Sequence, residues 1–244
     1  MAKELSGPGS LYVESKIANP KILDETTYLK WYDEVHIPEI IQMTGIKSAR
    51  RFKDINPDAD KPYLAIYPLK DIAFLGSEEF KHYTIKSDLL PGTGDITELA
   101  DFSNRIDSLI QVYDPTQRGT GHTRSIISAQ IELKEEADAE EFDKWYREEH
   151  LGRVAGATGY LRTTRFKLNV ARNISTTGES AAHAPAWLAI HEFAVESPDL
   201  LEIKKLAASP WTEKLLEGRK LSIFRVYKTM AEFGEEDWFH GHTA

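Results

Sequence analysis

The sequence contains no cysteine, which excludes disulfides, thiolate nucleophiles and cysteine-ligated zinc. Long apolar runs are also missing: residues 1–10 lack the apolar centre of a signal peptide, and no stretch approaches the length of a membrane span. Basic residues are scarce, with 30 Lys and Arg against 39 Asp and Glu and a net charge of −9. Because nonspecific nucleic-acid binding needs concentrated positive charge, we expect no nucleic-acid partner. The missing apolar segments lead us to expect a cytoplasmic protein without a membrane partner.

Cofactor motifs are equally absent. The two glycine-rich stretches, at residues 7–10 and 91–94, do not match the GxGxxG pattern of dinucleotide-binding loops. No HExxH or comparable spacing of histidines and carboxylates indicates a metal site, and the His-x-His pair His240 and His242 lies in what reads as a flexible tail. The sequence therefore predicts no cofactor and no metal, and leaves the chemistry to His, Tyr, Arg and carboxylates.

What the sequence does contain is an internal repeat. The stretch "WYDEVHIPEI" at Trp31–Ile40 returns as "WYREEHLGRV" at Trp145–Val154. Aligning residues 30–53 with residues 144–167 gives ten identities in twenty-four positions, including a histidine five residues after the tryptophan in each copy. Such self-similarity indicates an internal duplication, which the length of 244 residues can hold as two small domains.

The repeat extends over most of the chain. "YLAIYPL" at residues 63–69 matches "WLAIHEF" at residues 187–193, and "LIQVYDP" at residues 109–115 matches "IFRVYKT" at residues 223–229. The second copy carries an extra loop at residues 169–186, whereas the first carries its extra length around residues 89–98. We predict an N-terminal repeat over residues 8–118, a C-terminal repeat over residues 122–232 and a tail over residues 233–244.

Each copy has the same order of sequence patterns. Residues 127–133 alternate apolar and polar as a strand does, and residues 138–156 have helical spacing. Two strand-like stretches rich in aromatic and β-branched residues follow, then a helical segment broken at Ser209-Pro210 and a closing strand. The order strand, helix, strand, strand, helix, strand is that of a ferredoxin-like unit. The predicted fold class is α+β, with two such units in tandem.

These blocks resemble the dimeric α/β-barrel superfamily, and within it the EthD-like proteins common in fungi. The resemblance rests on "FDKWYREEHL", "GYLRTTRFK", "WLAIHEF" and "SPWTEKL" in the second copy, with a weaker version in the first. It implies that the two units form a barrel as an intrachain pseudo-dimer, leaves a further homodimer open, and implies a pocket between each sheet and its helices. The histidines His36 and His150 would reach into these pockets. Relatives include cyclases, decarboxylases, isomerases, dehydratases, monooxygenases and haem enzymes, so the resemblance does not name a reaction.

Aromatic residues precede the repeated histidine at a spacing that places them on the same helix face. Phe142 and Tyr146 precede His150 at intervals of four residues, and Tyr32 precedes His36 in the same way. The functional interpretation makes these aromatic residues a substrate-binding wall beside a catalytic imidazole. The alternative is ordinary core packing with the imidazole bonded to a backbone carbonyl.

A second histidine, His191, interrupts an apolar strand and shares a strand face with Trp187, which we expect to contact substrate. Its counterpart in the first copy is Tyr67. A histidine in such a strand needs a hydrogen-bonding reason. If His150 and His191 face one cavity, burial and mutual repulsion separate their pKa values and supply an acid and a base near neutral pH.

The remaining candidates lie on strands. Tyr227 could donate to a substrate carbonyl or stabilise an enolate, and Tyr113 parallels it in the first copy, although tyrosine is also an ordinary strand residue. Arg165 and its counterpart Arg51 could hold a carboxylate or phenolate through paired hydrogen bonds. Alternatively, these arginines are solvated strand ends.

The sequence therefore predicts a cofactor-independent enzyme of secondary metabolism that acts on a small apolar, aromatic or polyketide-like substrate. Acid–base catalysis by His150 and His191, in preference to His36, would drive a cyclisation, dehydration, decarboxylation or isomerisation. Two alternatives remain: a cofactor-free monooxygenase on a phenol, and a non-catalytic small-molecule binder.

Overall fold

The computed structural model describes residues 5–83, 85–135 and 138–234. The predicted tail over residues 233–244, with its two histidines, lies almost entirely outside the described residues. Among the described residues, every helix is too short or too polar to cross a bilayer. The chain is a mixed α/β protein in which helices and antiparallel strands alternate.

The elements of the first half are β1 (Gly9–Ile17), α1 (Glu25–Trp31), the π-helix η1 (Tyr32–His36), α2 (Ile37–Gln42), β2 (Ala49–Asp54), β3 (Tyr63–Leu69), the 3₁₀-helix η2 (Ile72–Gly76), α3 (Glu78–Lys81), the 3₁₀-helix η3 (Ile96–Glu98) and β4 (Ala100–Tyr113). The elements of the second half are β5 (Ser125–Leu133), α4 (Ala139–Trp145), the π-helix η5 (Tyr146–His150), α5 (Leu151–Val154), β6 (Tyr160–Ser175), β7 (Gly178–Ala181), β8 (Trp187–Phe193), α6 (Leu200–Ala207), α7 (Pro210–Glu217) and β9 (Arg219–Phe233).

Two compact units make up the described chain, and neither is continuous in sequence. The first unit takes the chain up to Leu109, then Leu168–Ala184 and the end of β9 from Met230. The second unit takes Ile110–Lys167 and Pro185–Thr229. Three strands, β4, β6 and β9, thus contribute residues to both units. The predicted repeat boundaries at residues 8–118 and 122–232 stay a prediction about ancestry.

Each unit contains a set of four antiparallel strands in an equivalent order, and the first unit also contains β7 with the end of β6. The first unit has the order β4-β1-β3-β2 and the second β9-β5-β8-β6. Leu11 on β1 pairs with Tyr67 on β3, and Ile127 on β5 pairs with His191 on β8. Tyr67 and His191 therefore occupy equivalent sheet positions, as the alignment predicts.

The alignment of the last strands is wrong. Ser10 and Ile126 are equivalent, and Ser10 pairs with Asp107 whereas Ile126 pairs with Tyr227. The structural counterpart of Tyr227 is therefore Asp107, six residues before Tyr113. The shared "VY" letters at residues 112–113 and 226–227 therefore lie at different positions along the two strands.

The segment at residues 169–186, predicted to be a loop, is largely a hairpin. Strand β6 runs on to Ser175 and pairs with β7. Polar side chains hold this extension within the first unit: the Ser103 hydroxyl donates to Asn173 Oδ1 at 2.7 Å, and Asn169 Nδ2 donates to Ser108 Oγ at 2.8 Å. The insertion is thus part of the first unit's architecture.

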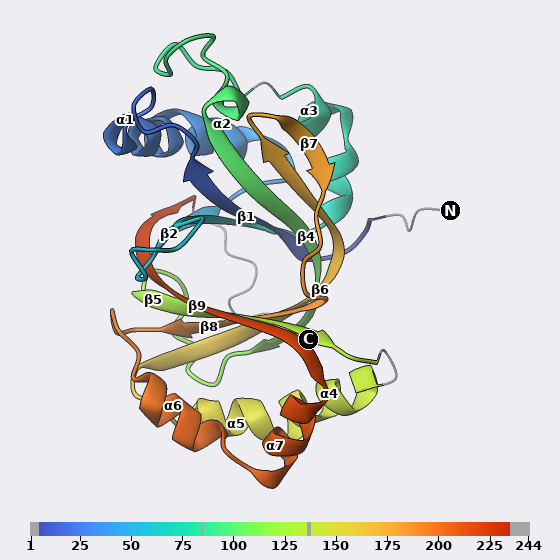
Figure 1. The fold of residues 1–244 in the computed structure, drawn as a ribbon. Helices are drawn as coiled ribbons and strands as arrows, with labels where there is room; N and C mark the ends of the chain where they lie inside the picture. The colour runs from blue at the N-terminus through green and yellow to red at the C-terminus, as the bar shows by residue number, and fades with distance from the viewer. Residues whose placement is uncertain (1–4, 84, 136–137, 235–244) are drawn as a thin grey trace. The chain divides into compact units, whose positions relative to one another are not determined.

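The helices of each unit cover one face of its own strands (Figure 1). In the first unit, Tyr28, Trp31 and Ile37 from the helical segment pack against Val13 and Ala65 from the strands. In the second unit an equivalent cluster joins helix and strand side chains, namely Phe142, Trp145, Leu151, Ala129 and Ala189. Burial of these apolar faces stabilises each unit by roughly 25 cal/mol per Å² of apolar surface.

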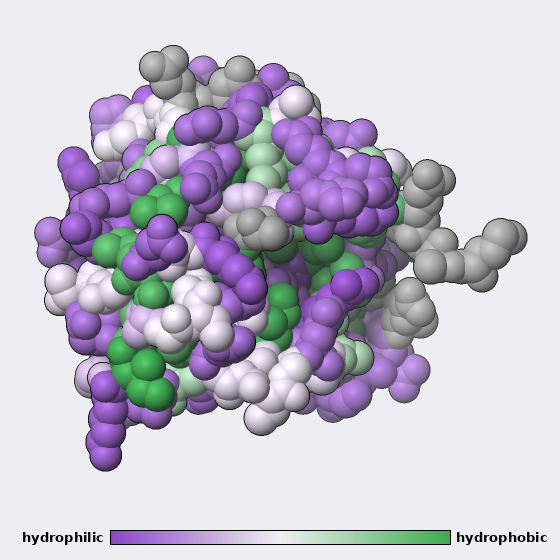
Figure 2. Space-filling model, turned by 90° about the horizontal axis from the view of Figure 1, so that it is seen from above, coloured by the Kyte–Doolittle hydropathy of each residue, from purple (hydrophilic) through white to green (hydrophobic). Residues whose placement is uncertain are grey.

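The face drawn in Figure 2 is mostly hydrophilic, with hydrophobic residues in separate patches. Across the described chain the most exposed large apolar side chain is Leu201, at 70%. Scattered apolar residues of this kind are ordinary on a protein surface.

Gly45 lies too close to the Phe74 ring for a larger side chain, so its substitution should destabilise the fold. A Cβ at this position would lie 2.1 Å from Cγ of Phe74, whereas a Cβ at Gly76 would meet nothing within 4 Å. We expect Gly45→Ala to lower the free energy of unfolding by about 1–3 kcal/mol, because the phenyl ring must move. Gly76→Ala, the matched control, should change it by less than about 0.5 kcal/mol. Urea unfolding of both variants checks this, and equal stabilities would contradict it.

Candidate functional site

The repeated histidine is positioned by a π-helical turn in both copies. Residues Tyr32–His36 and Tyr146–His150 form π-helices within otherwise α-helical segments. In an α-helix of about 3.6 residues per turn, side chains five positions apart diverge, but a π-turn brings them to the same side. His36 therefore stacks on Trp31 with ring centroids 4.7 Å apart, and His150 stacks on Trp145 at 4.1 Å. This contact explains why each copy keeps a histidine five residues after a tryptophan.

A buried arginine lies under the tyrosine that opens each π-turn. Arg51 Cζ lies 4.4 Å from the centre of the Tyr32 ring, and Arg165 Cζ lies 4.0 Å from that of Tyr146. Both arginines are only 1% exposed, so the interpretation as solvated strand ends is wrong. A desolvated guanidinium over an aromatic face is a favourable cation–π contact, worth about 2 kcal/mol.

The two arginines take their carboxylate partners from different sequence positions. Arg51 donates to Asp33, which follows Tyr32. Arg165 Nη1 donates to Asp143 Oδ1 at 2.8 Å, and Asp143 precedes Tyr146. Each buried guanidinium thus has an ion pair, because an unpaired buried charge would be strongly destabilising. The Nη2 atom of each guanidinium is buried without a hydrogen-bond partner, so the predicted role of these arginines in holding a substrate stays a prediction.

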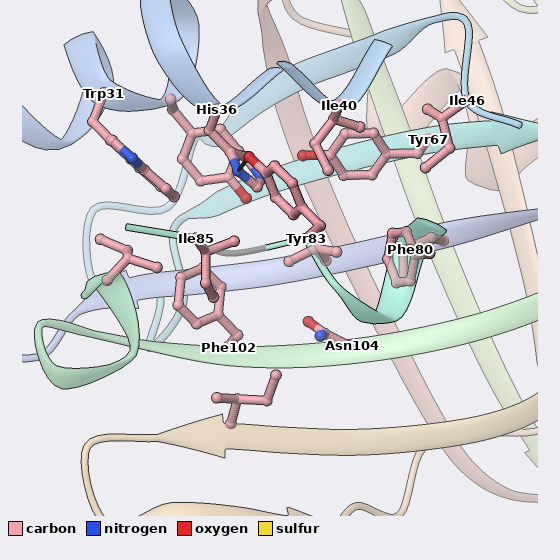
Figure 3. Close-up of a pocket in the computed structure, with 15 residues that line it drawn as sticks. Trp31, His36, Ile40, Ile46, Tyr67, Phe80, Tyr83, Ile85, Phe102 and Asn104 are labelled. Atoms are coloured by element: carbon pink, nitrogen blue, oxygen red, sulfur yellow. Dashed lines mark hydrogen bonds between the residues drawn. The ribbon is translucent and has the colours of Figure 1, made fainter. Parts of the chain in front are cut away.

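The first unit contains a cavity of about 230 Å³. Its lining combines helix, strand and loop side chains: Leu11, Val13, Trp31, Tyr32, His36, Ile40, Ile46, Tyr67, Phe80, Tyr83, Ile85, Ile96, Phe102, Asn104 and Ile174. Figure 3 shows the helix-borne Trp31, His36 and Ile40 on one side and Phe102 and Asn104 of β4 on the other. The wall is apolar and aromatic, with a few polar groups, as in small-molecule sites.

His36 is held in this wall by a short hydrogen-bond chain. Its Nδ1 lies 3.0 Å from the Tyr83 hydroxyl, which donates to Glu39 Oε2 at 3.1 Å. Because Tyr83 uses its proton for Glu39, its oxygen accepts a proton from Nδ1 of His36, and the neutral ring then has its lone pair on Nε2. Burial, with a smaller contribution from the charge of Arg51, lowers the pKa of His36 to about 3, so the ring is neutral at physiological pH.

Two polar groups of the cavity lack partners. The Tyr67 side chain is 2% exposed, and its hydroxyl lies beside Tyr32 but makes no hydrogen bond of normal geometry. Figure 3 shows this hydroxyl pointing to the side of the cavity where His36 and Tyr83 lie. Asn104 Oδ1 is also buried without a partner. These oxygens can therefore hydrogen-bond to polar groups of a molecule that enters the cavity.

The second unit brings its two predicted histidines together. The rings of His150 and His191 lie 6.3 Å apart, and Nδ1 of His191 is 2.7 Å from the Thr163 hydroxyl. A separate narrow space in this unit, lined by Phe142, Tyr146, Arg165 and Trp187 but by neither histidine, has about 0 Å³ for a water-sized molecule. Burial lowers the pKa of His150 to about 3 and that of His191 to about 4, so both rings are neutral at physiological pH.

The other predicted residues do not gather at that pair. Tyr227 pairs with Ile126 while His191 pairs with Ile127, and neighbouring strand residues point to opposite faces. Tyr227 is therefore directed away from His191. Tyr113 packs against the apolar clusters of the second unit.

Three site residues escape prediction from sequence: Tyr83, Glu39 and Asn104. Tyr83 lies between α3 and η3, in the part of the first copy that has no counterpart in the alignment. Glu39 stands where the second copy has Arg153. The structure gives this difference a consequence, because Glu39 accepts a hydrogen bond from the Tyr83 hydroxyl. Within the described chain, no group of three or more potential metal ligands is found.

Comparison with known proteins gives one related sequence of interest. No protein-family model matches the chain. The chain is 28% identical over 199 residues to core atranone cluster (CAC) protein 1 of Stachybotrys chlorohalonatus (strain IBT 40285), a match that covers 76% of this chain and 82% of the relative. The chain is thus a homologue of a fungal secondary-metabolite cluster protein. The predicted EthD-like membership stays a prediction.

Solved structures show the fold. A candidate monooxygenase from Fusobacterium nucleatum subsp. nucleatum has a TM-score of 0.57 at 11% identity, covering 94% of this chain and 95% of its own. An anthrone oxidase-like protein has a TM-score of 0.53 at 10% identity, covering 96% and 94%. At 10 to 11% identity these likenesses show that the chain shares the fold of these structures. The predicted superfamily stays a prediction beyond that likeness of fold.

The three buried histidines predict acid sensitivity. His36, His150 and His191 have pKa values lowered to about 3, 3 and 4 from 6.5. The unfolded chain therefore binds protons below pH 6.5 that the folded chain does not, and stability is present above pH 6.5 and lost as pH falls toward these values. Between pH 6.5 and 5 each histidine contributes a slope of up to about 1.4 kcal/mol per pH unit. Urea unfolding of wild type and His150→Phe checks this: the variant should show a shallower slope, and parallel curves would contradict it.

Proposed function

We propose that the protein is a small-molecule enzyme of secondary metabolism whose substrate binds in the cavity of the first unit. The observation that carries this proposal is the coincidence of an apolar 230 Å³ cavity with a neutral imidazole and two unpartnered polar groups. The cavity leaves room for a molecule beside the imidazole, and the Tyr67 and Asn104 oxygens can hydrogen-bond to polar groups of that molecule. The relationship to a secondary-metabolite cluster protein supports the same class of function.

The cavity size limits the substrate. A cavity of about 150 Å³ holds one benzene molecule, so 230 Å³ suits a substituted ring or a compact two-ring molecule. Aromatic walls from Trp31, Tyr32 and Phe102 favour a flat ligand. The polar groups favour a carbonyl or hydroxyl on that ligand, as in an aromatic polyketide.

The residues fit removal of a proton from carbon next to a carbonyl. His36, with the lone pair on Nε2, acts as the base. Burial raises the pKa of Tyr67 well above its usual value, so its hydroxyl stays protonated and donates to the oxygen on which negative charge develops. Isomerisation, cyclisation, dehydration and decarboxylation all start or end with such a proton transfer. No cofactor is needed for this step, which also occurs without oxygen.

A second candidate is a cofactor-free monooxygenase, favoured by the names of two structural neighbours, a candidate monooxygenase and an anthrone oxidase-like protein. It would begin with the same deprotonation, after which oxygen attacks the electron-rich carbon. The assignment of catalysis to His150 and His191 in the second unit stands as the competing proposal for the site. The tandem ferredoxin-like origin, the intrachain pseudo-dimer and a further homodimer stay proposals beside these.

The first functional prediction uses 2-tetralone, a two-ring ketone with an acidic benzylic C–H, as the probe. In D₂O we expect the protein to catalyse deuterium exchange at C1, measured by proton NMR. His36→Asn should reduce the exchange rate by on the order of 100-fold, because the base is lost. His150→Asn should keep it within about threefold, whereas the competing proposal requires the opposite ranking. Circular dichroism of both variants controls for folding.

Oxygen uptake separates the two reaction types. With 2-tetralone in air, a monooxygenase consumes oxygen and forms a product oxidised at C1 above the uncatalysed rate, and an isomerase-type enzyme exchanges the C1 proton without consuming oxygen. Oxygen uptake that depends on His36 would replace the first candidate by the second.

A further prediction concerns Tyr67. Tyr67→Phe removes only the hydroxyl and keeps the aromatic wall, so the rate of exchange should fall by roughly tenfold through lost stabilisation of the enolate. Binding of 2-tetralone, followed by quenching of tryptophan fluorescence, should weaken by less than about threefold. If binding persists in wild type with no exchange at all, the protein is a non-catalytic binder.

A further inference from the structure

The two hydrogen bonds from His36 through Tyr83 to Glu39 lead from the cavity to solvent. His36 lines the cavity, Tyr83 is partly buried, and Glu39 is exposed. The two hydrogen bonds, of 3.0 and 3.1 Å, connect a ring inside the cavity to a carboxylate in water. Few arrangements give a buried base such a short connection to solvent.

The surroundings of His36 disfavour its doubly protonated, positively charged form. Burial and the positive charge of Arg51 both disfavour the imidazolium, which is why its pKa is lowered to about 3. A base that must hold the substrate's proton as imidazolium would work against this environment. A base that passes a second proton on from Nδ1 as it accepts the first at Nε2 remains neutral throughout.

The second unit lacks each part of this chain. Nδ1 of His150 is buried with no hydrogen-bond partner. The residue at the position of Glu39 is Arg153, whose guanidinium donates to the backbone oxygens of Leu206 and Ala208 at 2.8 and 2.6 Å. An arginine used in this way cannot accept a proton. The repeat thus provides a natural comparison in which the π-turn and the stacked histidine are present without the connection.

We propose that Tyr83 and Glu39 form a proton relay that passes the Nδ1 proton of His36 toward solvent as Nε2 accepts the substrate's proton. The proposal rests on the proposed function of His36 as base. In the step, the substrate C–H bond breaks and its electron pair stays on the substrate as an enolate. The proton bonds to Nε2 of His36, the Nδ1 proton moves to the Tyr83 oxygen, and the Tyr83 hydroxyl proton moves to Glu39. Glu39 loses its negative charge as the enolate gains one, so charge balances.

A first measurement tests the relay without any substrate. In protein labelled with ¹⁵N-histidine, the nitrogen shifts of His36 should show the tautomer with the proton on Nδ1, and Tyr83→Phe should lose that preference. His36→Asn assigns the signal, while His150 and His191 serve as internal references. A wild-type His36 with its proton on Nε2 would overturn the relay whatever the activity.

A second measurement follows deuterium exchange of 2-tetralone. Tyr83→Phe and Glu39→Gln should lower kcat on the order of tenfold or more while KM changes by less than about twofold, and added imidazole buffer should restore part of the rate. Glu34→Gln, an exposed carboxylate of the same helical segment with no contact to Tyr83, is the matched control and should behave as wild type. A loss in Tyr83→Phe that no buffer restores, or no loss at all, would overturn the relay.

The two measurements separate the relay from the function it serves. If wild type has the proton on Nδ1 but exchanges none of the probe, the proposed function fails for this substrate class while the hydrogen-bond chain is confirmed. If wild type exchanges the probe through His36 and the Tyr83→Phe variant is unaffected, the function stands and the relay is wrong.

Discussion

The site depends on the stacking of a histidine on a tryptophan five residues before it, which a π-turn makes geometrically feasible. In the first unit this contact fixes the His36 ring against Trp31, so that one edge meets Tyr83 while the ring still lines the cavity. Relaxation of the turn to a regular α-helix would rotate the imidazole away from Trp31. The arginine under Tyr32 secures the other end of the turn from the opposite side.

The same scaffold produces two outcomes. In the second unit the stacked histidine lies beside His191, and Phe142 and Trp187 are in contact as Tyr28 and Tyr63 are in the first unit. In the first unit Tyr67 takes the place of His191, and Phe80, Tyr83 and Ile85 line a cavity beside His36. Equivalent positions thus place the stacked histidine beside a second histidine in one unit and beside a cavity in the other.

Sequence reasoning reaches the elements and the repeated positions because periodicity and the "WY…H" spacing are local properties. It identifies His36, Tyr32 and Tyr67 but prefers the second copy, since two histidines suggest an acid and a base. Whether space exists beside a side chain depends on the total packing of distant segments, which no local pattern records. Tyr83 and Asn104 are likewise placed by a loop and a strand register that the alignment does not reach.

The hairpin formed by β6 and β7 bears on how the protein evolves. It belongs to the second half of the sequence, yet Ile174 from it forms part of the wall of the first unit's cavity. Neither half encodes a complete site, so a gene truncated between the copies would lose the pocket even though every residue from Trp31 to Asn104 survived. A change in the second half of the sequence can therefore alter the site of the first unit.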